Sequence, residues 1–177
     1  MRKMWRALAV LSVLAAGACS GSGGSQPGGQ AGQASAPTVE TKWLRGLWAT
    51  DIREALASVG LICKGPVMEN RTNVWTCESG TPLVTYKVRF FGIAPGKIDY
   101  INAVVTQSGP AKDALPLRVF TALAGLRFEG ADQAKTREWM QASIAAGGSM
   151  AIGPARYKLS GDANRRVLDL KAADSEW

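Results

Sequence analysis

The three cysteines of this sequence are the residues best suited to covalent chemistry, and their spacing indicates which chemistry each can do. Cys19 lies near the N-terminus, whereas Cys63 and Cys77 lie further along the chain. A cysteine sulfur can carry a lipid, and two cysteines in an oxidising compartment can form a disulfide. Because Cys63 and Cys77 do not have the C-x-x-C spacing of a redox pair, we expect a structural disulfide between them.

The residue types give little support for nucleophilic catalysis or for a transition-metal site. The chain contains no histidine, which removes Ser-His and Cys-His nucleophiles and the commonest transition-metal ligand. It also lacks the S-x-x-K and G-x-S-x-G motifs of serine hydrolases. We therefore predict no enzyme, no metal site and no cofactor. A small hydrolase built on carboxylates or a Ser-Lys pair stays open, because such residues meet only in three dimensions.

Residues 1–18 have the pattern of an export signal that is removed. The positive start contains Arg2, Lys3 and Arg6, an apolar run follows, and small residues occupy positions 16–18. This order is typical of a signal peptide. The apolar run is shorter than the roughly 20 residues that a membrane-spanning helix needs, so we predict cleavage.

The position of Cys19 resembles that of the cysteine in a bacterial lipoprotein signal, which receives a lipid on its sulfur after cleavage. This resemblance implies a palmitate-type anchor on Cys19 that holds the protein to a bilayer, with Ala16 in place of the usual leucine. Ordinary cleavage after Ala18 is the alternative and would release a soluble protein. We favour the anchor, because pairing of Cys63 with Cys77 would otherwise leave an odd thiol in an oxidising compartment.

Composition divides the rest of the chain near residue 37. Residues 19–37 contain Cys19 followed by glycine, serine, glutamine, alanine and proline, with no large apolar side chain. Such a segment cannot offset the entropy lost on ordering, so it predicts a flexible linker. Residues 38–177 are numerous enough for one globular domain with its own core.

The net charge argues against nucleic acid as a partner. The whole chain carries a formal charge of +7. Without the three basic residues of the signal, 18 basic residues stand against 14 acidic ones, a net charge of +4. The basic residues are scattered and do not form the clustered stripe that binds phosphates. A weak attraction to anionic lipid or polysaccharide remains, within a screening length of about 8 Å.

The start of the domain predicts one or two helices. Apolar residues recur at helical spacing before and after a break near position 50. We expect Asp51 to be an N-cap with Glu54 as its capping-box partner, and Gly60 to end the helix. The apolar residues of this pattern are Trp43, Leu44, Leu47, Trp48, Ile52, Leu56 and Val59.

The middle of the domain predicts an antiparallel meander. Two β-prone runs, each containing a cysteine, flank a polar loop, and a hairpin centred near Asn70 places Cys63 opposite Cys77. Residues 84–90 alternate apolar and polar side chains, and residues 97–107 form a second long strand after a turn at 92–96. The polar side of the first strand carries Lys87 and Arg89, which are our candidate binding residues. A solvated sheet face explains them equally well.

The remaining residues predict two helices and a C-terminal hairpin. One helix starts near Pro116 and ends at Gly125, and the other starts at Asp132 as N-cap and ends before Gly147. Residues 156–159 and 167–170 then form the hairpin around a polar loop. Because helices and strands do not alternate regularly, we expect an α+β domain with an antiparallel sheet.

These features together predict an exported lipoprotein at the bacterial cell envelope, on its periplasmic or extracellular face. Its expected role is non-catalytic, as a binding or structural module. Its partners would be the bilayer, through Cys19, and an envelope protein or polysaccharide. A soluble secreted binding protein or inhibitor is the second hypothesis, and an unrecognised hydrolase is the third.

Overall fold

The computed structural model describes residues 42–108 and 115–175. The predicted signal peptide, Cys19 and the linker lie outside the described residues. Within the described ranges, the chain forms three helices and seven strands. They are α1 (Ala49–Ala57), β1 (Ile62–Glu69), β2 (Thr72–Gly80), β3 (Val84–Ala94), β4 (Lys97–Gln107), α2 (Leu115–Ala124), α3 (Gln133–Ser143), β5 (Gly148–Ile152), β6 (Ala155–Gly161) and β7 (Arg165–Ala172).

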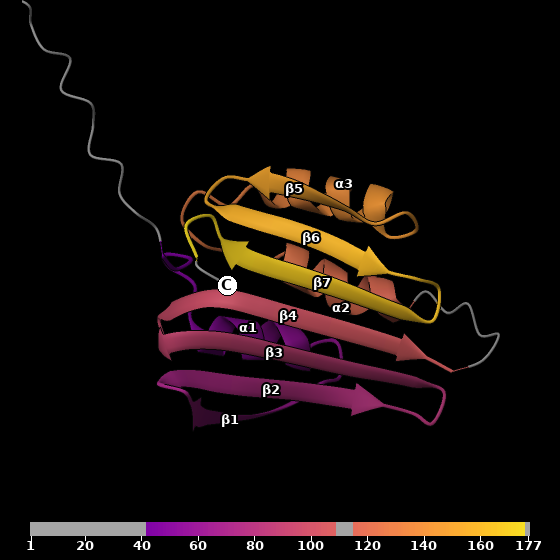
Figure 1. Ribbon diagram of the computed structural model, residues 1–177, viewed down its shortest axis with the longest axis horizontal. Coiled ribbons are helices and arrows are strands. Elements are labelled where there is room, and N and C mark those ends of the chain that lie inside the picture. The colour runs from indigo at the N-terminus through magenta and orange to yellow at the C-terminus, as the bar shows by residue number, and fades with distance from the viewer. Residues whose placement is uncertain (1–41, 109–114, 176–177) are drawn as a thin grey trace, which may run out of the picture. The chain divides into compact units, whose positions relative to one another are not determined.

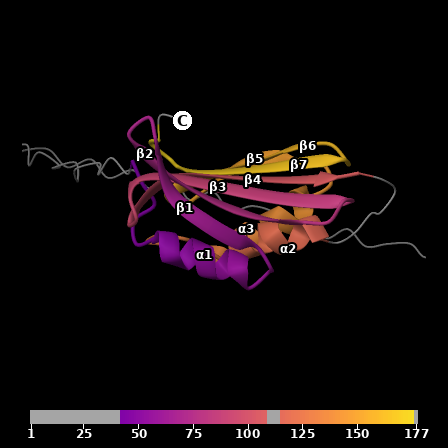
Figure 2. The same ribbon diagram turned by 90° about the horizontal axis from the view of Figure 1, so that it is seen from below.

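All seven strands form one antiparallel sheet in the order β1-β2-β3-β4-β7-β6-β5. The fold is therefore α+β, as the sequence predicted. The three helices lie against one face of the sheet, and the opposite face, which we call the open face, carries no helix (Figure 1, Figure 2). The core lies between the helices and the sheet, where alternate strand residues meet the apolar helix faces.

The order of the strands divides the sheet into two halves. In the first half the chain enters at the edge strand β1 and moves inward to β4; in the second half it enters at the other edge, β5, and moves inward to β7. Helices precede the strands in both halves, with α1 before β1 and α2 and α3 before β5. The two halves join where β4 pairs with β7, from Tyr100 with Lys171 to Thr106 with Arg165.

The N-terminal region contains one helix, so the two-helix alternative is wrong. Residues 43–48 form turns, because Gly46 takes a left-handed φ of +76° that interrupts the helical spacing. Asp51 as N-cap is also wrong. The cap is Trp48, whose backbone N–H donates to the Asp51 carboxylate at 2.9 Å. Asp51 therefore caps from inside the first turn rather than from its start.

The disulfide hairpin has the predicted centre and register. Asn70 and Arg71 both have left-handed φ angles, +47° and +68°, as a two-residue hairpin turn requires. Cys63 is paired directly with Cys77 in the register, and the two sulfurs form a disulfide. The first strand is longer than predicted. It continues through the cis Gly65-Pro66 bond, where the register shifts by a bulge, to Glu69.

The central strands confirm the alternation in the sequence. Val84, Tyr86, Val88 and Phe90 of β3 are buried, and β4 has the predicted bounds. The turn between them is tighter than predicted, because β3 continues to Ala94 and the strands are joined through residues 95–96.

The second half confirms both helices and extends the predicted hairpin. Asp132 caps α3 by accepting from the Lys135 N–H at 3.0 Å, and α2 ends before Gly125. The C-terminal region has three strands rather than two, because β5 pairs with β6 along its whole length. Gly161 has a φ of +101°, and a Cβ there would collide with the carbonyl of Arg165. In the part of the chain that the structure describes, no helix is long and apolar enough to span a membrane.

Candidate functional site: the open face of the sheet

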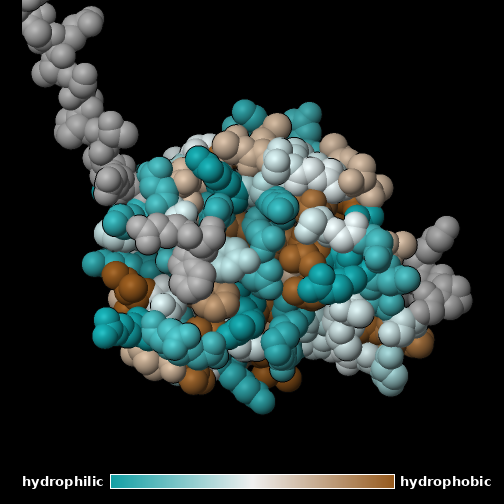
Figure 3. Space-filling view, viewed as in Figure 1, coloured by the Kyte–Doolittle hydropathy of each residue, from teal (hydrophilic) through white to brown (hydrophobic). Residues whose placement is uncertain are grey.

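The predicted binding residues Lys87 and Arg89 both lie on the open face. The buried residues of β3 alternate with them and point to the helices, so their own side chains point to solvent. The face is hydrophilic over most of its area, with smaller hydrophobic areas between (Figure 3). The structure therefore places this pair where the sequence predicted, on the solvated side of a central strand.

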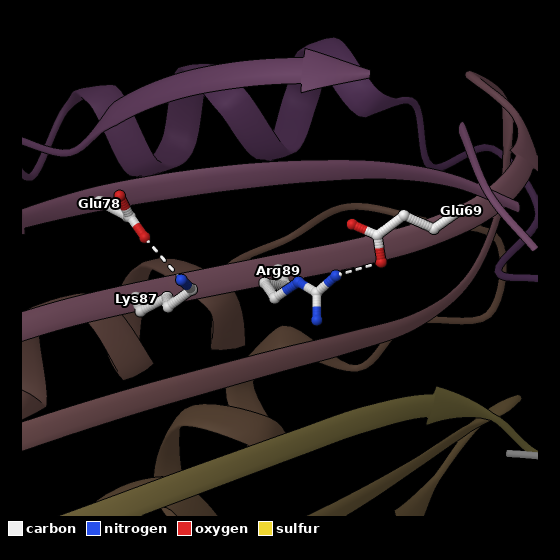
Figure 4. Close-up of polar contacts among 4 residues, drawn as sticks. All are labelled: Glu69, Glu78, Lys87 and Arg89. Carbon is white, nitrogen blue, oxygen red and sulfur yellow. Dashed lines mark hydrogen bonds and ion pairs between the residues drawn. The ribbon is translucent and has the colours of Figure 1, made fainter. Parts of the chain in front are cut away.

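Each of the two cations is paired with an acidic residue of a neighbouring strand. The Lys87 Nζ lies 2.8 Å from a carboxylate oxygen of Glu78, which is its direct register partner on β2. The Arg89 guanidinium lies 2.7 Å from the Glu69 carboxylate of β1 (Figure 4). Hydrogen bonding to Lys87 and its positive charge lower the pKa of Glu78 below its ordinary value. The two pairs therefore leave little net charge at this part of the face.

Arg89 is held by a second contact. Its guanidinium carbon lies 5.0 Å from the centre of the Phe91 ring, and Phe91 stacks on Tyr100 with 5.4 Å between ring centres. Cations are attracted to aromatic faces at such distances. Arg89 is thus fixed between a carboxylate and a ring. The sequence did not reveal either acidic partner, because the disulfide fixes only the β1–β2 register, whereas Glu78 meets Lys87 through the β2–β3 register.

Three polar residues from β4 and β7 form a cluster beside this pair. Tyr100 and Asn102 of β4 both donate hydrogen bonds to Oδ1 of Asp169 on β7, the second at 2.7 Å. Asn102 and Asp169 are direct register partners. The pKa of Tyr100 is raised from 10.0 to about 12. Burial of the hydroxyl is the largest cause, and the hydrogen bond to Asp169 is the second. Asp169 therefore accepts two side-chain hydrogen bonds from β4.

The Tyr100 pKa predicts how stability depends on pH at the alkaline end. Because the folded-state pKa is above the unfolded value of 10.0, the contribution of Tyr100 is fully present below pH 10.0. It is lost as the pH rises from 10.0 to about 12. We expect Tyr100→Phe to remove that part of the decline. Urea unfolding of both proteins between pH 9 and 11.5 measures this, and equal declines in the two proteins would contradict it.

The strands of the second half carry an excess of basic residues on the open face. The register places Lys171 beside Arg156, and Lys158 beside Asp169, which is the one acidic residue that β5, β6 and β7 contribute to this face. We call four residues of β6 and β7 the basic strip: Arg156, Lys158, Arg165 and Lys171. Sequence reasoning missed the strip, because its members are separated in the chain. The β6–β7 register brings Arg156, Lys158 and Lys171 together, and Arg165 lies further along β7, beside Thr106 of β4.

Among residues 42–108 and 115–175, no group of three or more histidine, cysteine, aspartate or glutamate side chains is placed to hold a metal ion. No protein family model, curated protein or solved structure matches this chain. The function is therefore argued from the residues and their geometry.

Proposed function

We propose that this protein is an exported lipoprotein of the bacterial cell envelope that acts as a non-catalytic binding module. An acyl chain on Cys19 anchors it to a membrane, and residues 19–37 act as a flexible linker to the domain. The soluble form released by cleavage after Ala18 is the second candidate, with the same binding surface. The absence of histidine from the whole sequence supports a role without nucleophilic catalysis.

The observation that carries the binding role is the basic strip. Four basic residues and one acidic residue share the charged part of the open face on β6 and β7, and Asp169 already accepts two hydrogen bonds. Arg156, Lys158 and Arg165 are exposed. A row of exposed cations along a broad sheet face matches an extended polyanion, so the favoured partner is an acidic envelope polysaccharide rather than an envelope protein.

The anchor is tested by metabolic labelling with a palmitate analogue. We expect the wild-type protein to be labelled and to sediment with membranes, and Cys19→Ser to be unlabelled and soluble. The intact mass of the mature protein then gives the cleavage site and the number of acyl chains. A wild-type mature protein that is unacylated would contradict the anchor and favour the soluble form.

The basic strip is tested with polygalacturonate, a carboxylated polysaccharide, immobilised on beads. We expect Arg156→Gln/Lys158→Gln to reduce retention of the Cys19→Ser protein about tenfold or more at 50 mM salt, because two exposed charge contacts are lost. The matched control is Arg53→Gln/Arg127→Gln, which removes the same charge from residues outside the sheet. Equal losses in the two variants would show that only net charge matters and would contradict the proposal.

A further inference from the structure

A groove lies in the helical layer, on the opposite side of the domain from the open face. It has an outer part of about 670 Å³ between α1, α2 and α3, and an inner part of about 310 Å³ that reaches the β2–β3 turn. Val59 and Arg118 line both parts, so the two hollows lie next to each other. Volumes of this size are typical of sites for small molecules.

The inner part of the groove has a mainly apolar lining, with Ser79 and Thr81 as polar residues at the β2–β3 turn. Leu61, Val84 and Val119 are buried residues at its wall, and Leu83 of the turn is 57% exposed at its rim. Tyr86 also lines this part. A surface of this kind gains free energy when it is covered by hydrocarbon, at about 25 cal/mol per Å² of apolar area removed from water.

The outer part of the groove carries two positive charges. Arg118 comes from α2 and Arg137 from α3, and no aspartate or glutamate is among the described residues that line either part. Neither arginine makes an ion pair with a described residue. The Arg137 side chain extends over Gly125 at the end of α2, where a Cβ would lie 3.4 Å from its Nη2. The absence of a side chain at Gly125 leaves room for the guanidinium beside the groove.

We propose that this groove binds a single-chain anionic amphiphile, specifically a long-chain fatty acid. The acyl chain occupies the inner, apolar part, and the carboxylate lies in the outer part beside Arg118 and Arg137. Two guanidinium groups are well suited to a carboxylate, because each can donate two parallel hydrogen bonds to it. Arg118 borders both parts and therefore defines where the chain ends and the headgroup begins. The site is independent of the basic strip, which lies on the other face of the sheet.

The probe for this site is cis-parinarate, a fluorescent C18 fatty acid, with its methyl ester as the uncharged counterpart. The full-length chain carrying Cys19→Ser is titrated without detergent, so that no acyl anchor competes. We expect saturable binding of one parinarate per chain and weaker binding of the ester. Arg118→Gln/Arg137→Gln should weaken parinarate binding about tenfold and leave ester binding within twofold, since two exposed charge contacts are lost.

Two further variants separate the groove from general effects. Val59→Trp places a large ring where the two parts meet and should abolish binding of both probes. The charge-matched control Arg53→Gln/Arg127→Gln lies outside the groove and outside the basic strip, and should keep parinarate binding within twofold. Thermal unfolding of each variant shows that the fold is retained. The proposal is overturned if parinarate does not saturate, if the ester binds equally well, or if the control loses as much affinity as the groove variant.

Discussion

Replacing Phe90 with alanine is expected to lower the free energy of unfolding by about 3–5 kcal/mol, the usual cost of deleting a buried phenylalanine ring. Phe90 is fully buried on the helical side of β3. Its ring stacks on Trp75 of β2, with 5.2 Å between ring centres and 5° between planes. The substitution therefore removes buried apolar area, leaves a cavity, and breaks an aromatic pair worth about 0.5–1.5 kcal/mol of that cost.

Urea unfolding followed by tryptophan fluorescence measures the effect of Phe90→Ala. Ile93→Ala is the matched control, because Ile93 lies on the same strand but is 60% exposed. We expect the control to change the free energy of unfolding by less than about 0.5 kcal/mol, as is usual for exposed positions. Similar losses in the two variants would mean that β3 does not place alternate residues in the core.

Removal of the Cys63–Cys77 disulfide is expected to lower the free energy of unfolding by about 3 kcal/mol, because the bond closes a loop of about 15 residues in the unfolded chain. The cross-link joins the edge strand β1 to β2, where the register already shifts between Lys64 and Val67. A shifted edge strand has fewer regular ladder contacts to hold it, so the covalent bond supplies much of its attachment.

The measurement compares the oxidised Cys19→Ser protein with the same protein carrying Cys63→Ala/Cys77→Ala. A reducing agent should destabilise the first protein by about the same amount and leave the second unchanged. Hydrogen exchange should show the loss of protection concentrated in β1. A difference below about 1 kcal/mol would indicate that packing of the buried Cys77 position, rather than the cross-link, holds the hairpin.

Local features of the sequence were sufficient for most of the fold. The alternation along β3 identified its buried face, and Asn70 identified the hairpin turn, because both depend on residues adjacent in the chain. Asp132 was recognised as an N-cap for the same reason. The errors arose where a neighbouring element decided the outcome. Gly46 interrupts a pattern that otherwise fits a helix, and β1 continues through Gly65-Pro66 because β2 lies beside it.

The candidate sites depend on contacts that separation in the chain conceals. Lys87 and Arg89 were located on the correct face, but the pairing of Arg89 with Glu69 joins residues 20 positions apart. Asp169 meets Tyr100 only because β4 and β7 are neighbours, 69 positions apart in the chain. The groove is formed by α1, α2, α3 and the β2–β3 turn. None of these contacts between elements follows from the hydrophobic periodicity of the sequence, because that periodicity describes only one helix or strand at a time.

The inward order of the strands has a consequence for how the domain is assembled during synthesis. Protein chains emerge from the ribosome N-terminus first. The first four strands can pair as soon as they emerge, since each lies beside its predecessor. β4 then exposes unsatisfied backbone groups until β7, which extends to Ala172, arrives to cover them. A nascent chain that stalls before β7 is complete would expose the unpaired edge of β4. Truncations within β7 should therefore recruit chaperones far more strongly than truncations after it.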